Sequence, residues 1–525
     1  MHAAWAMGLA ACGLAGSMLM ADHAGAQVTV TGGALAGTLV EDGKVRVYKG
    51  VPFAAPPVGA LRWKAPQPVV PWTGVRQATE FGAHCLQGPL FGDMIFREPA
   101  SEDCLYLNVW APAEKPSSPL PVMVWIHGGG FQAGAASEPR HDGHHLVQKG
   151  VLLVTANHRL GVFGFLAHPG MASEADNTAG NFGLLDMIAA LDWVKHNAAA
   201  FGGDPGNVTI FGESAGSFAV NALMASPRAR GLFHKAIGES GAFFGPSLAA
   251  PTREASLQRG ETFAGSLGAD SLEALRALPG EAVLKAALGA QPWFGPTIDG
   301  TVLVEPVAET FAAGRQAQVP LLAGWNADES RGGVVLAKEK MTAARFVGQT
   351  KERFGPHADK LLSVYPASSD AEALESAAAL AGDLFIGYAT WKWIESHAAT
   401  GNASVFRYRF DRKIPVAPDT MVNGIRATAE DIGARHAGEI EYVFGTLDSV
   451  PRVTWTDADR TLSDRMMTYW TSFAATGVPS GPGVPTWPAY AAPSRLVLHL
   501  DTSIRVAPES ARDRFEVLDE ILRAR

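Results

Sequence analysis

The chain has few cysteines, few charged side chains and no cluster of basic residues. Of its 525 residues, three are cysteine and 18% are charged, against about 25% in an average protein. Its formal net charge is −9 at pH 7. Because phosphate binding depends on clustered Lys and Arg, this balance argues against nucleic acid as a partner. Gly and Pro are plentiful but follow no period, which excludes a collagen-like or disordered chain.

Long apolar runs are also missing, except at the N-terminus. Ala3 to Met20 is apolar, and Ala24-Gly25-Ala26 has the small-x-small form that signal peptidase cuts. We therefore expect residues 1–26 to be a signal peptide and the mature protein to be secreted or periplasmic. A membrane anchor and a lipoprotein box ending at Cys12 are the alternatives. No other run could span a bilayer, so we expect no stable membrane insertion.

The cysteines fit an exported protein. Cys12 lies in the leader, so Cys85 and Cys104 form the only intrachain pair available to the mature chain. A disulfide between them would persist in an oxidising compartment. The alternative is two free, buried thiols.

The order of apolar segments predicts one α/β domain over residues 27–525. Val28 to Val40 and Lys44 to Tyr48 have the pattern of a β-hairpin. Strands alternating with helices predict a mostly parallel central sheet flanked by helices. Helix-rich insertions, Asp270 to Leu288 and Ala371 to His397, are expected near the mouth of the site. Further strands are expected at 105–110, 121–126, 151–156, 208–211, 235–238, 319–324, 405–410 and 496–500, and helices at 184–199, from about 214, and at 462–475.

The strongest motif is Gly212-Glu213-Ser214-Ala215-Gly216, between a predicted strand and a predicted helix. In this setting G-x-S-x-G forms a sharp turn that exposes a nucleophilic serine. The alternative is an ordinary strand–helix turn. Serine needs a base to accept its proton, so the motif also predicts a partner histidine and acid.

A second motif is the glycine run that starts at His127 and ends at Phe131, after the apolar segment 122–126. Bare backbone N–H groups after a strand suit a developing oxyanion. A phosphate-binding loop is the alternative, but the run lacks the Gly-Lys-Ser/Thr ending.

With these motifs in place, the chain resembles the type-B carboxylesterase and cholinesterase family of α/β-hydrolases. The resemblance runs from Lys49 almost to the C-terminus and implies an α/β-hydrolase fold. It rests on segments in the order of the family: 49–57, 101–109, 157–161, 201–205, 324–329 and 435–445. The family has a disulfide whose second cysteine matches Cys104.

The resemblance also implies a triad of Ser214, His436 and Glu329 in the order found in α/β-hydrolases. Asp328 and Asp299 are rival acids, and His127 is the rival histidine. The implied oxyanion donors are the N–H groups of Gly129, Gly130 and Ala215. No metal or organic cofactor is expected.

Two other features leave alternatives open. Glu213 either orients water or substrate or is a structural carboxylate. The His-rich segment from Arg140 to His145 matches no standard metal-ligand spacing, so a solvated loop is favoured.

The departures from the family concern specificity. The segment between Cys85 and Cys104 has no Trp, which counts against choline esters. Met187 and Glu239 stand where Gln is usual. Candidate pocket walls are Phe131, Phe165, Phe243, Phe244 and Trp325. The sequence thus predicts a serine carboxylesterase acting on small, uncharged esters. The alternatives are a specialised hydrolase of toxin, carbamate or aromatic esters, and a non-catalytic binding protein.

Overall fold

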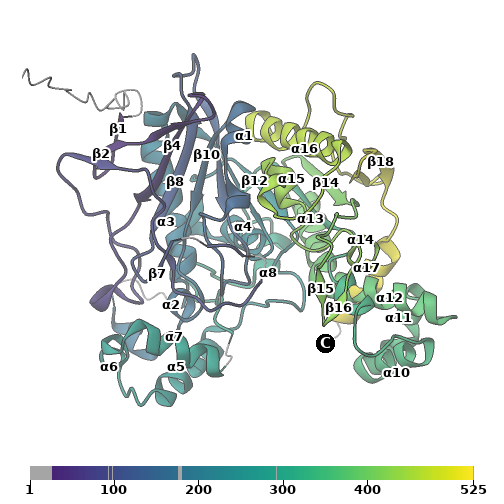
Figure 1. Cartoon of the computed structure of the whole chain (residues 1–525). Coiled ribbons are helices and arrows are strands. Elements are labelled where there is room, and N and C mark those ends of the chain that lie inside the picture. The colour runs from purple at the N-terminus through teal and green to yellow at the C-terminus, as the bar shows by residue number, and fades with distance from the viewer. Residues whose placement is uncertain (1–26, 93, 97, 175–179, 291–292, 524–525) are drawn as a thin grey trace, which may run out of the picture.

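The computed structural model describes residues 27–525, apart from 93, 97, 175–179, 291–292 and 524–525 (Figure 1). The predicted signal peptide lies outside the described residues. None of the helices in the described part of the chain is long and apolar enough to cross a bilayer.

A twisted sheet of eleven strands runs through the centre of the molecule (Figure 1). Seven neighbouring strands are parallel to one another, and the strands at both edges are antiparallel. This confirms the expected mostly parallel α/β sheet. In spatial order the strands are β18 (Arg505–Pro508), β17 (Leu496–Leu500), β14 (Val405–Phe410), β13 (Leu321–Asn326), β12 (Lys235–Glu239), β11 (Gly203–Glu213), β9 (Leu120–Ile126), β10 (Leu152–Ala156), β8 (Tyr106–Pro112), β4 (Val45–Pro52) and β3 (Thr38–Val40).

The central strands are buried on both faces, which explains their nearly continuous apolar sequence. Phe218 and Trp393 belong to the apolar core on one face, and Trp470, Phe211 and Ile237 belong to the core on the other face. The helices on the first face include α3 (Phe182–Asn197), α4 (Ala215–Ala225) and α13 (Tyr388–Thr400); those on the second include α1 (His144–Gln148), α15 (Ile440–Phe444) and α16 (Asp457–Thr476).

The helical insertions form two separate groups on the same side of the molecule (Figure 1). The first group is α5 (Arg253–Ser266), α6 (Leu272–Ala277) and α7 (Gly280–Ala290). The second is α10 (Ala343–Phe354), α11 (Ala358–Val364) and α12 (Asp370–Gly382). The segment 371–397 is helix-rich as expected, and a π-helical segment, Asp383–Gly387, lies between α12 and α13. Smaller elements near them are α2 (Gly161–Phe165), α8 (Val307–Ala312), α9 (Arg331–Val335), α14 (Ala429–Ile432), β15 (Met421–Val422), β16 (Ile425–Arg426) and α17 (Arg512–Arg523).

The N-terminal hairpin is more broken than its pattern suggested. Gly32 and Gly33 turn the chain with positive φ, so β1 (Gln27–Val30) pairs with β2 (Gly33–Ala36) in a small separate sheet with β5 (Val75–Gln77). Only β3 and β4 form the expected hairpin in the large sheet. Nearby, Cys85 and Cys104 form the expected disulfide, with Cα atoms 5.0 Å apart, beside β6 (His84–Cys85) and β7 (Ala100–Ser101).

Candidate active site

Ser214 lies in the sharp turn between β11 and α4, at the carboxyl edge of the sheet. Its backbone has φ 52° and ψ −122°, a conformation that few residues other than glycine adopt. A Cβ on Gly216 would lie 2.0 Å from the Ile126 carbonyl oxygen, and one on Gly212 would lie 2.6 Å from the same atom. Both glycines are therefore required by close packing of this turn against β9, as the motif predicts.

The side chains of Ser214, His436 and Glu329 form one hydrogen-bonded chain. The Ser214 hydroxyl lies 2.9 Å from Nε2 of His436, and Nδ1 of His436 lies 2.6 Å from Oε2 of Glu329. These three residues come from different loops, and the structure brings them together as the resemblance implied. Glu329 is buried, whereas the His436 ring is 24% exposed, so the ring can meet a ligand.

The rival residues have other partners. The Asp328 carboxylate accepts the Ala434 N–H at 2.9 Å and so supports the loop that carries His436. Asp299 accepts backbone N–H groups of the turn that follows it. His127 is buried and stacks on His158, with ring centroids 4.4 Å apart.

The glycine loop after β9 packs directly on the serine turn. A Cβ on Gly128 would lie 3.2 Å from Cβ of Ser214. Gly129 and Gly130 have φ of 105° and 63°, in the left-handed region that favours glycine. Ala215 begins α4, where the first N–H groups have no partner within the helix. The predicted oxyanion donors therefore lie beside Ser214.

Hydrogen bonds fix the orientation of two peptide groups in this loop. The Gly128 carbonyl accepts a hydrogen bond from Nδ1 of His127 at 2.9 Å, and the Gly129 carbonyl accepts the N–H groups of Gln132 and Ala133. Because C=O and N–H point in opposite directions across a trans peptide, the Gly129 and Gly130 N–H groups point away from these contacts. Burial lowers the pKa of His127 to about 4, so the ring is neutral and donates through Nδ1.

Glu213 lies against the same histidine. Its Oε1 is 3.4 Å from Nε2 of His436 and has no hydrogen-bond partner among the described residues. Burial raises the pKa of Glu213 to about 8. Burial alone would lower the pKa of His436, but the carboxylates of Glu213, Glu329 and Glu439 outweigh it and raise that pKa to about 9. The site thus favours a positive charge on the imidazole.

Beneath the triad is a group of buried carboxyl side chains, which we call the carboxyl cluster: Glu213, Glu239, Glu329 and Glu439. None of the four is paired with Lys or Arg in the described part of the chain. Burial and Glu439 raise the pKa of Glu239 well above its usual range. Burial raises the pKa of Glu439 to about 7. The pKa values of Glu213, Glu239 and Glu439 are all raised, because several buried negative charges at close range are unfavourable.

Polar residues around this cluster were missed in the sequence. Ser240 donates to Oε1 of Glu329 at 2.7 Å, and Asn326 donates its backbone N–H to the same oxygen and its amide to Glu439. The Trp470 indole donates to Oε1 of Glu239. Ser240 follows β12 and Asn326 ends β13, so their position at the carboxyl ends of parallel strands was the available signal.

The predicted pocket walls fall into two groups. Phe131, Phe165 and Phe243 are buried and pack ring to ring beside the glycine loop, whereas Phe244 packs against Phe311. Trp325 faces a different cavity, described below. Phe385, which was not predicted, lies edge to face on His436 with ring centroids 5.0 Å apart. It stands in the π-helical segment, and no sequence signal marks that segment.

The His-rich segment is engaged with protein groups. His141 is buried and its Nδ1 lies 3.1 Å from the Ala135 carbonyl, while His144 pairs with Asp142 at 2.6 Å. Among the described residues, no three His, Cys, Asp or Glu side chains are placed to hold a metal ion.

A mostly parallel α/β sheet that presents a serine turn, a histidine and an acid at its carboxyl edge defines the chain as an α/β-hydrolase. Comparison with known proteins narrows this class. Residues 24–517 match the model of the Carboxylesterase family. The chain belongs to this family and is a carboxylic ester hydrolase.

Relatives cover most of the chain. It is 39% identical over 511 residues to para-nitrobenzyl esterase of Bacillus subtilis, covering 92% of this chain and 97% of that protein. It is 38% identical to fumonisin B1 esterase of Sphingopyxis macrogoltabida, covering 86% and 82%. A solved structure of a pNB esterase superposes with a TM-score of 0.79 at 38% identity, covering 94% of this chain and 99% of that chain.

Proposed function

We propose that the protein hydrolyses carboxylic esters through an acyl-enzyme on Ser214. His436 takes the Ser214 proton as the hydroxyl oxygen attacks the ester carbonyl, and then gives this proton to the departing alcohol. Glu329 holds the Nδ1–H tautomer of His436 and stabilises its cation. Water then attacks the acyl-enzyme with His436 again as base, which releases the acid and restores Ser214.

The N–H groups of Gly129, Gly130 and Ala215 are the proposed donors to the tetrahedral oxyanion. Their support is the glycine loop that lies on Ser214 with its carbonyls held on the opposite side. Each such donor typically lowers the barrier by about 3 kcal/mol.

We propose uncharged esters of short to medium acyl chain as substrates. The carboxyl cluster makes the surroundings of Ser214 unfavourable for an anionic acyl group. Phe131, Phe243 and Phe385 supply apolar surface beside the glycine loop and His436. A specialised toxin, carbamate or aromatic ester is the alternative, and one relative is named fumonisin B1 esterase.

The hydrogen-bonded chain from Ser214 through His436 to Glu329 carries the mechanism. The test is a panel of p-nitrophenyl esters of increasing chain length, hydrolysed by wild type and by Ser214→Ala. We expect kcat to fall by about 10⁴-fold or more in the variant. Equal rates would exclude Ser214 as the nucleophile. In a parallel assay, a fluorophosphonate probe should label His436→Ala far more slowly than wild type.

We also propose that the protein is exported. The Cys85–Cys104 disulfide supports an oxidising compartment. Mass spectrometry of the exported fraction should find a mature chain that begins at Gln27, and a cytoplasmic, uncleaved chain would contradict export.

A further inference from the structure

A cavity adjoins the triad at Glu329. It has a volume of about 420 Å³ and is lined by the end of β13, by α12, β14 and β17, and by the start of α17. Glu329 and Asn326 line it, whereas Ser214 and His436 do not. The cavity is therefore next to the triad but separate from the place where the ester would bind.

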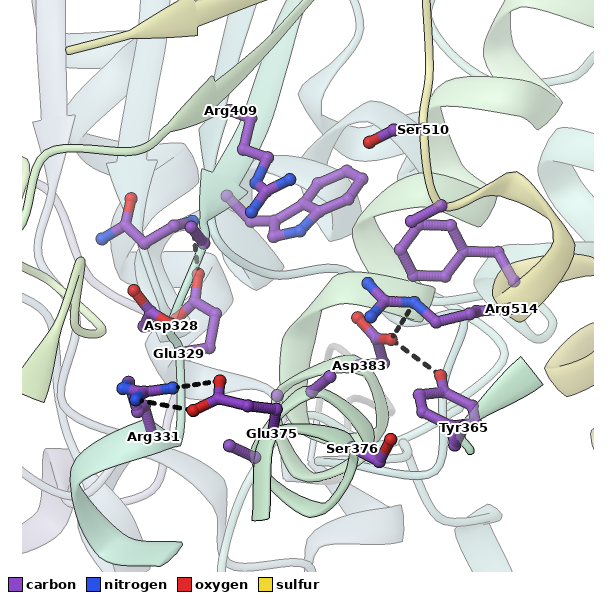
Figure 2. A pocket seen from close by; sticks show the side chains of 18 of the residues that line it. Asp328, Glu329, Arg331, Tyr365, Glu375, Ser376, Asp383, Arg409, Ser510 and Arg514 are labelled. Atoms are coloured by element: carbon purple, nitrogen blue, oxygen red, sulfur yellow. Dashed lines mark hydrogen bonds and ion pairs between the residues drawn. The ribbon is translucent and has the colours of Figure 1, made fainter. Parts of the chain in front are cut away.

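Four arginines line this cavity, and one of them, Arg331, is bound to Glu375. Arg407 and Arg409 lie two residues apart on β14, so the pleat of the strand directs both to the same face. The aromatic residues between and beside them, Phe406, Tyr408 and Phe410, pack into the core on the other face. Arg514 comes from α17, and Figure 2 shows the guanidinium groups of Arg409 and Arg514 pointing inward from two sides.

These guanidinium groups have unused donors. Arg409 is ion-paired with Asp411 through Nε at 2.9 Å, and Arg514 with Asp383 through Nε at 3.3 Å. Neither guanidinium group donates a hydrogen bond with good geometry to any described residue. The Arg407 side chain is 4% exposed, and its buried Nε also has no partner in the described part of the chain.

The six carboxylates that line the cavity also have partners among the described residues. Glu375 is bound to Arg331, Glu509 to Arg407, and Asp383 accepts the Tyr365 hydroxyl. Asp328 accepts the Ala434 N–H, Glu372 accepts Ser368, and Glu329 accepts His436. Burial raises the pKa of Asp383, while the positive charges of Arg514 and Arg409 both oppose this shift. Both guanidinium groups are therefore close enough to the Asp383 carboxyl group to affect its charge.

We propose that this cavity is a binding site for a small dicarboxylate, with Arg409 and Arg514 as the principal ligands. A guanidinium fork matches the two oxygens of a carboxylate, and two forks on opposite sides suit a ligand with two such groups. The cavity volume is enough for a molecule of four to six carbons, within the general range of small-ligand sites.

The experiment measures succinate binding by calorimetry at constant ionic strength, using enzyme whose Ser214 has been blocked with a fluorophosphonate. Blocking excludes product-like binding at the triad. We expect saturable binding of one succinate per chain, with acetate weaker and chloride without effect. Failure of the blocking reaction would count against Ser214 as nucleophile, not against the cavity, because labelling is measured separately.

Arg409→Gln and Arg514→Gln should each weaken succinate binding by about tenfold or more, since each loses hydrogen bonds to a charged ligand. Arg331→Gln is the matched control, because Arg331 lines the same cavity but is bound to Glu375. It should leave the affinity within about twofold. Arg409→Lys keeps the positive charge but loses the forked pair of donors, so it should bind succinate with intermediate affinity. Such a result would exclude misfolding as the cause of the weaker binding in Arg409→Gln.

Three results would overturn the proposal. The first is the absence of saturable succinate binding to the blocked wild type. The second is unchanged affinity in Arg409→Gln and Arg514→Gln. The third is tighter binding of inorganic phosphate than of succinate, which would assign the site to a different oxyanion.

Discussion

Two charged regions meet at Glu329, and they are built in opposite ways. On the Ser214 side, the carboxyl cluster is buried without a Lys or Arg partner among the described residues. On the other side, Arg407, Arg409 and Arg514 line a cavity. Each is ion-paired with one carboxylate, and each keeps guanidinium donors that these ion pairs do not use. The first region has carboxyl groups without Lys or Arg partners, and the second has guanidinium donors beyond those used in its ion pairs.

The difference shows how one fold can give two kinds of chemistry at the same sheet edge. Buried carboxyl groups at close range have raised pKa values, so their protonation changes with pH, and two of them contact the His436 imidazole, whose pKa they raise. Guanidinium groups cannot lose their protons, so the donors that their ion pairs leave unused stay available to an acceptor from outside. We therefore expect the first region to respond to pH and the second to dissolved carboxylates.

The variant expected to distinguish the two regions most clearly is Glu329→Gln, because Glu329 belongs to the triad and also lines the cavity. The amide keeps the shape but loses the charge that stabilises the imidazolium, so kcat should fall by about 10³-fold or more. Succinate binding should persist, because the variant removes a negative charge from the cavity wall. Steady-state kinetics with a p-nitrophenyl ester and calorimetry on the same sample measure both effects.

Asp328→Asn is the matched control for this comparison. Asp328 is the neighbouring acid and supports the Ala434 N–H, but does not contact His436. We expect its kcat to fall by less than about tenfold, since a neutral acceptor retains most of that hydrogen bond. If Asp328→Asn were as inactive as Glu329→Gln, Glu329 would not be the specific partner of His436.

A smaller effect is expected at Glu213, which raises the pKa of His436 from the side opposite Glu329. His436 must be neutral to accept the Ser214 proton, so kcat/KM should rise with pH as His436 loses its proton. Glu213→Gln removes one negative charge and lowers the pKa of His436, so the acidic limb of the profile should move to lower pH.

The measurement is kcat/KM against pH for wild type and Glu213→Gln with one uncharged ester. A shift to higher pH, or superimposable profiles, would contradict the electrostatic role of Glu213. Unchanged succinate affinity in Glu213→Gln would show that the substitution affects the carboxyl cluster and not the cavity.

The residues on the Ser214 side were largely predictable because their motifs are local and sterically strict. Gly212 and Gly216 cannot carry a Cβ in the serine turn, and Gly129 and Gly130 need positive φ. The partners Glu329 and His436 came from the family resemblance, since the distance of 107 residues between them has no physical signature of its own.

The cavity and the carboxyl cluster were not predictable in the same way. Alternation along β14 puts Arg407 and Arg409 on one face, but only the packing of α12 and α17 shows that this face lines a cavity. The π-helical segment that places Phe385 on His436 has no sequence signal, because one extra residue per turn arises from tertiary packing.

The smallest effect in this comparison concerns Glu239, which is completely buried and bound to the Trp470 indole. Its pKa in the folded protein is raised above the ordinary 4.5 by burial and by Glu439. The folded state therefore keeps a proton that the unfolded state releases, and this contribution to stability is lost as pH rises above 4.5 toward the folded-state pKa. Glu239→Gln keeps the hydrogen bond from Trp470 and cannot ionise.

Thermal unfolding of wild type and Glu239→Gln between pH 5 and pH 8 should thus give diverging curves. The variant should be within about 1.5 kcal/mol of wild type at pH 5, the usual range for one altered hydrogen bond, and should gain relative stability toward pH 8. Glu352→Gln, at an exposed position on α10, is the control and should leave the pH dependence unchanged. Parallel curves for wild type and Glu239→Gln would mean that Glu239 has a cationic partner. The carboxyl cluster and the arginine-lined cavity would then differ in geometry but not in how their charges are paired.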